Sequence, residues 1–597
     1  MKLAETASAA GAAPAPVTRL QSDVRRLAVP TVLLIVAVTV GFLAPGTWRF
    51  VAISAAIQGL VSLSAGMLFG RVGLLSLCPL AFAAVGAWVV TWFTVHQRLP
   101  FLIMVAIGAL AAVPAGVFVG GLALRLRGVN LAVVTLAFGV AVVAVITQHK
   151  FPGSQDSVSR PIRPLGFTSD RMYFLLCVGV LVAVGLGLEW YGRRRGGQSW
   201  RAVRYSERAT AAAGLSVPGV KLRAFIVSAA IAGTAGGLFL GQYKGGISET
   251  TFQPISSLVV TAASVLIGAV SLSGAFFGGV LAAVFPEVFR RFHWATQYPQ
   301  IIFGVGAIHA LSRGNGGISA GFPWRRPRPS RQQPAPAPPP LFHDAASGPV
   351  APASVLEVRG LTVRYGALTA LSQVDVLVPE SAVVGVIGPN GAGKSTLIDA
   401  VTGFVHHYGG TVLLRDRPID ALGATARARA GARRTFQQGR AIPELTVGQY
   451  VQLCTPHPLA AEEMRNLLGF FGLPPHDQPI SFVDVGTRRV IEVAACVASR
   501  PAVAFLDEPA AGLGEQQSHD LAEQIREIPA RFGTSVVLIE HDVALVAAVC
   551  SRITVLDFGL VIADGSPTEV LNDPRVASAY LGDDTAVEAA LHAERLT

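Results

Sequence analysis

Gly388-Pro389-Asn390-Gly391-Ala392-Gly393-Lys394-Ser395 decides the fold of the second half of this chain. A glycine followed, after four residues, by Gly-Lys-Ser is the pattern of a Walker A loop. In such a loop backbone N–H groups close around phosphate, the lysine reaches the outer phosphates and the serine hydroxyl binds Mg²⁺. The apolar run 383–387 before the loop predicts a buried strand, and Ser395 and Thr396 begin a helix. Because the motif requires this strand–loop–helix context, residues 388–396 are predicted to bind nucleotide phosphates together with Mg²⁺.

The composition of the chain divides it into two dissimilar halves. Its 597 residues are enough for several domains, and they are 51% hydrophobic but only 14% charged. Residues 1–312 are overwhelmingly apolar, whereas residues 355–585 have the composition of an ordinary α/β domain. A net charge of +11 is compatible with nucleic-acid binding, but the densest basic runs, 193–195 and 325–328, lie beside apolar stretches. We therefore predict that positive charge holds loops in the cytoplasm and that nucleic acid is not a partner.

The cysteines give no sign of a disulfide framework or a zinc site. Five are scattered along the chain without paired spacing, at Cys78, Cys177, Cys454, Cys496 and Cys550. This pattern predicts packing residues in a reducing or membrane setting.

About ten stretches in the first half approach the roughly twenty apolar residues that a bilayer requires. They lie near 27–44, 50–69, 73–95, 101–124, 130–148, 172–190, 222–241, 255–272, 274–289 and 298–312. Arginine and lysine are concentrated before the first stretch and in the loop 191–223, so an even number of spans places both termini in the cytoplasm. The predicted fold is an α-helical polytopic domain of the plasma (inner) membrane, followed by an α/β P-loop nucleotide-binding domain that is also cytoplasmic.

Composition also predicts the boundaries of these domains. The five expected segments are a cytoplasmic tail (1–26), the transmembrane domain (27–312), a Pro/Gly/Arg-rich linker (313–354), the ATP-binding domain (355–585) and a C-terminal tail (586–597). An extended linker of this length reaches on the order of 100 Å. The ATP-binding domain therefore need not dock on the membrane half to which it is tethered.

Candidate catalytic residues follow two further apolar strands. The strand 502–506 leads into Asp507 and Glu508. The aspartate can hold Mg²⁺, and the glutamate can polarise water for attack on the γ-phosphate. The strand 535–539 leads to His541, which can contact the γ-phosphate, although a structural surface histidine is the alternative.

Two more residues fit roles at the same site. Gln437 suits a glutamine that reaches both Mg²⁺ and the attacking water, and Tyr365 is placed to stack on adenine. The alternative for Tyr365 is a core residue at a strand end. Ser395, Gln437 and Asp507 are thus the predicted Mg²⁺ ligands.

On these motifs, residues 355–585 resemble the ATPase of an ABC transporter, and specifically one ATPase of the branched-chain amino-acid importers. The supporting segments are 434–437, 506–513, 538–543, 553–559 and 579–582. Residues 27–312 are similar to a permease of the same importers, on segments 73–77, 125–139 and 265–274.

The resemblance implies a fused permease and ATPase subunit of an ATP-driven importer for branched-chain or related amino acids, with ATP and Mg²⁺ as cofactors. It also implies a second permease, a second ABC ATPase and an extracytoplasmic solute-binding protein that delivers a small solute. In that family a short coupling helix in a cytoplasmic permease loop docks on the ATPase. Residues 201–214 match this region, with Ala209 among small residues and helix formers and Gly214 as the stop.

One motif departs from the family. The ABC signature, which binds the γ-phosphate of ATP held by the opposing ATPase, corresponds here to residues 483–487. Gly486 is kept, but Asp484 stands where a serine hydroxyl would donate to phosphate. A close, desolvated carboxylate would repel phosphate by several kcal/mol. Either Asp484 turns away or the composite site that uses this signature is impaired, which suggests an asymmetric pair of ATPases.

The solute is left open, whereas three other classes of protein fit the sequence less well. Importers of urea, short amides or aromatic acids are similar assemblies, and nothing in the spans specifies the solute. A fused half-exporter would have about six spans with long cytoplasmic extensions, and a membrane-tethered regulatory ATPase would lack a coupling loop. A proton-coupled carrier usually needs a buried ionisable group, and no Asp, Glu or Lys lies in the middle of a predicted span.

Overall fold

The computed structural model describes two long parts of the chain, 35–312 and 354–580, together with residue 318. Within these parts it leaves out residues 37, 98, 125, 127, 153–162, 243–246, 248, 296–297 and 438–440. The predicted tails 1–26 and 586–597, and nearly all of the predicted linker 313–354, lie outside the described residues. The chain divides into two units. Unit 1 comprises Met1–Trp190 and Leu222–Arg326, and unit 2 comprises Tyr191–Lys221 and Pro327–Thr597.

Within the described residues, seven helices are long and apolar enough to cross a membrane. They are α2 (Gly46–Met67, continued by η1, Leu68–Val72), α3 (Pro79–His96), α4 (Phe101–Ala123), α5 (Val129–His149), α6 (Asp170–Arg193), α9 (Val217–Gln242) and α11 (Leu272–Arg291). The chain is therefore a polytopic α-helical protein in this half, as predicted.

The seven helices are fewer than the ten spans expected from the sequence. The predicted span 255–272 is instead the 14-residue helix α10 (Pro254–Ile267), because Gly268 adopts a left-handed conformation and ends it. The predicted span 298–312 is α12 (Tyr298–Ser312), which has 15 residues, too few for an ordinary span. A short 3₁₀ helix, η2 (Glu249–Phe252), precedes α10. Much of the predicted span 27–44 lies outside the described residues.

Small residues let the helices of unit 1 approach closely. A Cβ added at Gly236 of α9 would lie 1.9 Å from the carbonyl oxygen of Ala83 in α3. A Cβ added at Gly66 of α2 would lie 2.1 Å from the carbonyl oxygen of Ala269. The glycine and alanine content of the spans thus serves helix packing. All five cysteines are buried, as predicted for packing residues.

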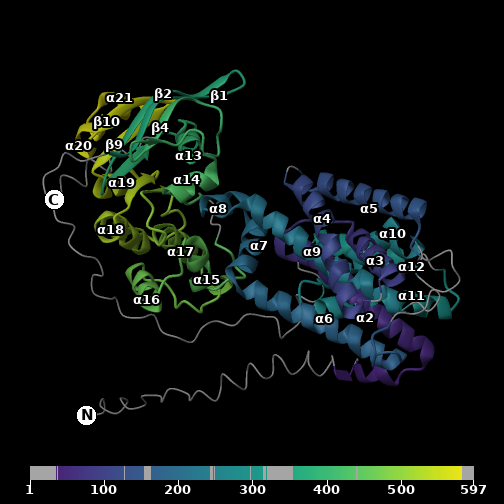
Figure 1. The fold of residues 1–597 in the computed structure, drawn as a ribbon. Coiled ribbons are helices and arrows are strands. Elements are labelled where there is room, and N and C mark those ends of the chain that lie inside the picture. The colour runs from purple at the N-terminus through teal and green to yellow at the C-terminus, as the bar shows by residue number, and fades with distance from the viewer. Residues whose placement is uncertain are drawn as a thin grey trace, which may run out of the picture. The chain divides into compact units, whose positions relative to one another are not determined.

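Unit 2 contains two sheets, and Figure 1 labels strands β1, β2 and β4 of one and strands β9 and β10 of the other. One is antiparallel, in the order β2-β1-β4-β5, and the other has six strands in the order β10-β9-β3-β8-β7-β6. The strands are β1 (Ser354–Tyr365), β2 (Leu368–Pro379), β3 (Val383–Ile387), β4 (Gly409–Leu414), β5 (Arg417–Pro418), β6 (Ala432–Arg434), β7 (Val503–Asp507), β8 (Ser535–Ile539), β9 (Arg552–Asp557) and β10 (Leu560–Gly565).

In the six-stranded sheet every neighbouring pair is parallel except β9 and β10. Strands β3, β7 and β8 are fully buried, which explains why each is a continuous apolar run in the sequence. All three were predicted, with β7 displaced by one residue. Since parallel strands end at one edge of the sheet, the loops that follow β3, β7 and β8 meet there.

Helices complete unit 2. They are α7 (Arg195–Tyr205), α8 (Glu207–Ala212), α13 (Lys394–Val401), α14 (Ala424–Ala430), α15 (Val447–Cys454), α16 (Ala461–Phe470), α17 (Val485–Val497), α18 (Glu515–Phe532), α19 (Val543–Val549), α20 (Pro567–Leu571) and α21 (Pro574–Tyr580), with a 3₁₀ turn η5 (Ile480–Phe482). One apolar core lies around the two sheets and α13. A second joins α15, α16 and α17 to the other side of the parallel sheet.

Candidate functional site

The loop between β3 and α13 has the backbone conformation that a phosphate-binding loop requires. Gly388 has φ +149° and Gly393 has φ +105°, both in the region that favours glycine. A Cβ at Gly388 would lie 2.1 Å from the carbonyl oxygen of Leu556, so only glycine fits. Asn390 is exposed in the loop, while Ser395 and Thr396 lie in the first turn of α13. The predicted phosphate-binding residues therefore form one continuous strand–loop–helix element.

Lys394 is buried at the centre of this loop. Its ammonium group donates hydrogen bonds to the carbonyl oxygens of Gly388 at 2.6 Å and Pro389 at 2.9 Å. Burial lowers the pKa of Lys394, and the nearby carboxylates of Glu508 and Asp507 oppose that shift. The lysine is thus a desolvated cation aimed at the loop, which suits it to bind an anionic phosphate.

The three predicted catalytic residues converge at the edge of the parallel sheet. Gln437 donates its amide N–H groups to both carboxylate oxygens of Glu508, at 3.0 Å each. His541 Nε2 lies 2.9 Å from Glu508 Oε1. These residues follow β6, β7 and β8, which are neighbours in the sheet, so the topology alone brings them together. A water activated by Glu508 would lie within reach of both other side chains.

The backbone at Glu508 is strained and firmly held. Glu508 has φ +48°, an uncommon value for a residue with a side chain. Its N–H donates to the carbonyl oxygen of Ile539 at 2.9 Å, and its carbonyl oxygen accepts from Arg489 of α17 at 2.6 Å. Such strain is often found at active sites, where it fixes a functional group in place. Arg489 was not singled out from the sequence.

Asp507 is buried next to Glu508 and paired with a buried arginine. Burial raises the pKa of Asp507, and the guanidinium of Arg434, 3.0 Å away, opposes that shift. The backbone N–H of Asp507 donates to the hydroxyl of Thr435 at 3.1 Å. The carboxylate is therefore held in one orientation by residues that immediately precede Gln437.

The predicted Mg²⁺ ligands have suitable chemistry. Ser395, Gln437 and Asp507 offer a hydroxyl, an amide oxygen and a carboxylate, and Mg²⁺ prefers such hard oxygen donors. The amide nitrogen of Gln437 donates to Glu508, so the amide oxygen does not take part in that contact. These residues therefore fit a Mg²⁺–nucleotide complex.

Tyr365 lies at the end of β1, where it pairs with Leu368 of β2. Its side chain is 51% exposed. A half-exposed aromatic at a hairpin is free to cover a flat ligand and is not a core residue. Its assignment to adenine remains a proposal.

The signature region places Asp484 at the N-terminus of α17. Its carboxylate accepts the N–H of Thr487 at 2.8 Å and so caps the helix, while Gly486 is buried in the first turn. This backbone hydrogen bond lowers the pKa of Asp484, so the group is anionic at neutral pH. The carboxylate therefore lies at the N-terminus of its own helix. There it occupies a position in which another anion could bind the free N–H groups of the first turn.

The predicted coupling region forms a short helix within unit 2. Ser206 caps α8 by accepting the N–H of Ala209, and the helix is followed by Gly214 at φ +76°. Helix α8 contacts α14, and Arg429 of α14 donates to the carbonyl oxygen of Gly214 at 2.8 Å. The region thus contacts α14 of the same unit through its small residues and its turn.

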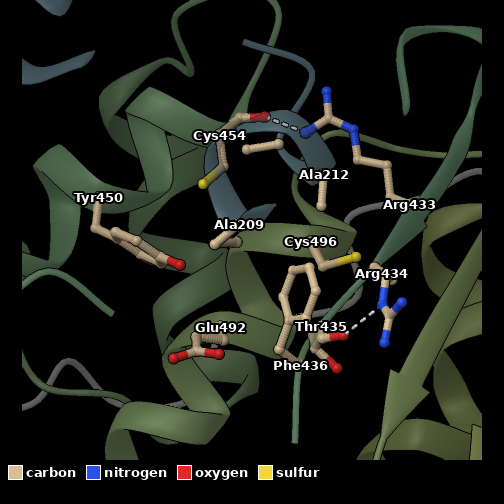
Figure 2. Close-up of a pocket in the computed structure, with 12 residues that line it drawn as sticks. Ala209, Ala212, Arg433, Arg434, Thr435, Phe436, Tyr450, Cys454, Glu492 and Cys496 are labelled. Atoms are coloured by element: carbon tan, nitrogen blue, oxygen red, sulfur yellow. Dashed lines mark hydrogen bonds between the residues drawn. The ribbon is translucent and has the colours of Figure 1, made fainter. Parts of the chain in front are cut away.

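Figure 2 shows the pocket beside this contact, with Ala209 and Ala212 facing the α15 and α17 side chains. Its lining residues are Ala209, Ala212, Ala213, Arg433, Arg434, Thr435, Phe436, Tyr450, Cys454, Glu492, Ala495 and Cys496. Arg433 and Arg434 of β6 and the two residues after them line this pocket together with α8, and Arg208 of α8 lies 5.9 Å from the centre of the Phe436 ring. The docked helix therefore touches the segment that carries Gln437.

Comparison with known families decides the identity of both halves. Residues 47–311 match the family model described as the permease component of the branched-chain amino acid transport system, and residues 371–511 match the model described as ABC transporter. Residues 561–586 match a third model, the branched-chain amino acid ATP-binding cassette transporter. The chain belongs to the branched-chain amino acid family of ABC transporters. It is a fused permease and ATPase of an ABC importer, and hence an ATP-hydrolysing transporter.

Two relatives support this assignment for the transporter's ATPase half. The high-affinity branched-chain amino acid transport ATP-binding protein LivG of Salmonella typhimurium is 37% identical over 250 residues, which are 38% of this chain and 98% of LivG. BraF of Pseudomonas aeruginosa, with the same description, is 34% identical over 253 residues, 38% of this chain and 98% of BraF. A solved ADP conformation of an ATP-binding cassette is 27% identical, with a TM-score of 0.35, and covers 38% of this chain and 99% of that structure.

The transporter also contains site residues that no sequence pattern indicated. Glu540 is buried, and its carboxylate accepts the N–H of Ala510 at 2.8 Å, which fixes the turn after Glu508. Asp399 of α13 pairs with Arg434. Both are acidic residues next to a motif, and only their burial and partners distinguish them from surface carboxylates.

Proposed function

We propose that this chain imports branched-chain amino acids across the plasma membrane, with its ATPase domain and both termini in the cytoplasm. The predicted span 27–44, added to the seven long helices of the described residues, gives the even number that this topology requires. We further propose that it works with a second permease, a second ABC ATPase and an extracytoplasmic solute-binding protein. The observation that carries the proposal is the docking of α8 and Gly214 on the segment that leads to Gln437, because it joins the permease loop to the catalytic edge.

The side chains divide the work of ATP hydrolysis. Lys394 and the N–H groups of its loop bind the phosphates, and Tyr365 covers the adenine. Glu508 polarises the attacking water, which Gln437 and His541 orient through their contacts with the same carboxylate. Mg²⁺, held by Ser395, Gln437 and Asp507, would neutralise charge that develops on the phosphates.

We also propose that the two ATP sites of the complex are unequal. Asp484 presents a negative charge where the signature would receive the phosphate of the partner's ATP, and its hydrogen bond with Thr487 holds it there. The Walker A loop of this chain and its residues Glu508, Gln437 and His541 are intact. Its own ATP is therefore hydrolysed against the partner's signature, and the partner's ATP is hydrolysed slowly.

The solute assignment is tested by uptake. The complex of this chain with its two partner subunits is placed in proteoliposomes, and ATP-dependent uptake of labelled leucine is measured with and without the binding protein. Uptake that needs all components and is lost in Glu508→Gln supports the proposal. Unlabelled isoleucine and valine should compete, whereas urea, short amides and aromatic acids should not.

Two results would overturn the proposal in different ways. Competition by urea or an aromatic acid, with leucine ineffective, would assign another solute to the same importer. ATP hydrolysis that is unaffected by the binding protein, with no uptake of any solute, would instead favour a membrane-tethered regulatory ATPase.

A further inference from the structure

Four charged side chains form a continuous row from the docked segment to the metal-site carboxylate. Arg208 of α8 donates to Oδ2 of Asp399 at 2.7 Å, and Oδ1 of the same carboxylate pairs with Arg434. The other end of the Arg434 guanidinium lies 3.0 Å from Oδ2 of Asp507. Arg434 thus bridges the carboxylates of Asp399 and Asp507. Asp399 also pairs with Arg208, and Asp507 is also a predicted Mg²⁺ ligand.

The row runs from solvent into the protein interior. The side chain of Arg208 is 57% exposed and that of Asp399 is 23% exposed, whereas Arg434 and Asp507 are 4% and 7% exposed. Ion pairs are weak at the surface and strong where water is excluded. The outer pair can therefore form and break easily, while the inner pair responds to any change in the charge of Asp399.

Two aromatic rings hold the guanidinium groups in this row. Phe404 and Phe436 lie edge to face at 5.9 Å. Arg208 lies 4.8 Å from the centre of the Phe404 ring, and Arg434 lies 4.5 Å from that of Phe436. Cation–π contacts of this kind fix the plane of a guanidinium. Phe436 is also the residue before Gln437, so the row and the catalytic glutamine share one short segment.

We propose that Arg434 is a positioning residue that couples the docked segment to the metal site: through Asp399, Arg208 sets how tightly Arg434 holds Asp507, and hence how tightly the site holds Mg²⁺. This inference rests on the proposed role of Asp507. When Arg208 is paired with Asp399, Arg434 interacts more strongly with Asp507 and competes with a metal cation for that carboxylate. When Arg208 leaves, Asp399 draws Arg434 away and Asp507 becomes available.

The proposal predicts opposite shifts for two variants of the row. Arg208→Gln frees Asp399 to attract Arg434, so metal affinity rises. Asp399→Asn leaves Arg434 with Asp507 as its remaining partner in the row, so metal affinity falls. Each shift should be roughly threefold or more, since contacting charges typically show measurable coupling. The probe is Mn²⁺ binding to the full-length chain saturated with a non-hydrolysable ATP analogue, followed by electron paramagnetic resonance of free Mn²⁺.

Arg429→Gln is the matched control for Arg208→Gln. It removes a positive charge from the same docking surface, where Arg429 donates to the carbonyl oxygen of Gly214, but the residue is not part of the row. A shift in Mn²⁺ affinity that occurs in Arg208→Gln and not in Arg429→Gln supports coupling through the row. Equal shifts in both would assign the effect to docking or to general charge and would overturn the proposal.

Arg434→Lys tests the bridge itself. A lysine keeps the charge but cannot span two carboxylates with a rigid fork. In this background Arg208→Gln should no longer change Mn²⁺ affinity, although each protein still binds the nucleotide. If the shift from Arg208→Gln persists in Arg434→Lys, the row does not carry the coupling. Because nucleotide and Mn²⁺ binding are measured without transport, failure of leucine uptake would leave this result intact.

Discussion

Replacing Asp484 by asparagine should restore the slow ATP site without destabilising α17. Asparagine caps helices about as well as aspartate, so the hydrogen bond from Thr487 is kept and stability changes by only a few tenths of a kcal/mol. A unit charge about 5 Å from a phosphate costs roughly 3 kcal/mol at an effective dielectric constant of 20. Solvent screening reduces this to about 1 kcal/mol, because the Asp484 side chain is exposed.

The assay must separate the two ATP sites of the complex. In a complex that carries Lys394→Ala, the remaining hydrolysis takes place on the partner's ATP and uses the signature of this chain. Single-turnover hydrolysis there should be slow, and Asp484→Asn should accelerate it about fivefold, as expected for about 1 kcal/mol. In the reciprocal complex, with the partner's Walker A lysine replaced, Asp484→Asn should have no effect.

A second variant separates capping from charge. Asp484→Ala removes both and should lower the stability of the ATPase by about 1 kcal/mol, while still relieving the repulsion. Equal loss of hydrolysis from the two lysine variants would contradict the asymmetry. No acceleration by Asp484→Asn in the Lys394→Ala complex would show that the carboxylate is not the cause.

Three further predictions follow from the geometry of the site. Glu508→Gln should reduce ATP hydrolysis at least about 100-fold while ATP still binds, because it removes the base that polarises water; hydrolysis rate and equilibrium binding are compared. Gly388→Ala places a Cβ 2.1 Å from the carbonyl oxygen of Leu556 and should lower stability by about 1–3 kcal/mol and weaken ATP binding. Gly423→Ala, where the added Cβ meets nothing within 4 Å, is its control, and equal melting temperatures for the two would contradict the steric account. Burial raises the pKa of Glu540, so the folded state binds a proton more tightly than the unfolded state and stability falls as pH rises above about 4.5. Glu540→Gln should flatten this fall in melting temperature as the pH rises from about 4.5, and an unchanged slope would contradict the prediction.

Local patterns in the sequence were sufficient to predict the strands and loops that carry the candidate site. Strands β3, β7 and β8 are continuous apolar runs because both faces of the sheet are covered, so hydropathy alone located them. The catalytic residues could be predicted because they directly follow these strands, and parallel strands end at one edge. Gln437 was recognised from its motif, and its place beside Glu508 follows from the neighbouring position of β6.

The membrane spans were predicted less accurately than the strands, because hydropathy does not show where a helix ends in a packed membrane domain. Gly268 interrupts an apolar run by adopting a left-handed conformation, which composition does not reveal. The ion pairs of Arg434 could not be predicted either, since Asp399 is 35 residues away in sequence and Asp507 is 73 away. Pairings of this kind depend on the tertiary fold, and a charged residue beside a motif gives no sign of its partner.

The contacts of residues 207–214 define how this segment of the permease half engages the ATPase domain to which it is fused. The structure places Tyr191–Lys221 in the same compact unit as the ATPase domain. Specific contacts, such as Arg429 with Gly214 and Arg208 with Asp399, define this arrangement.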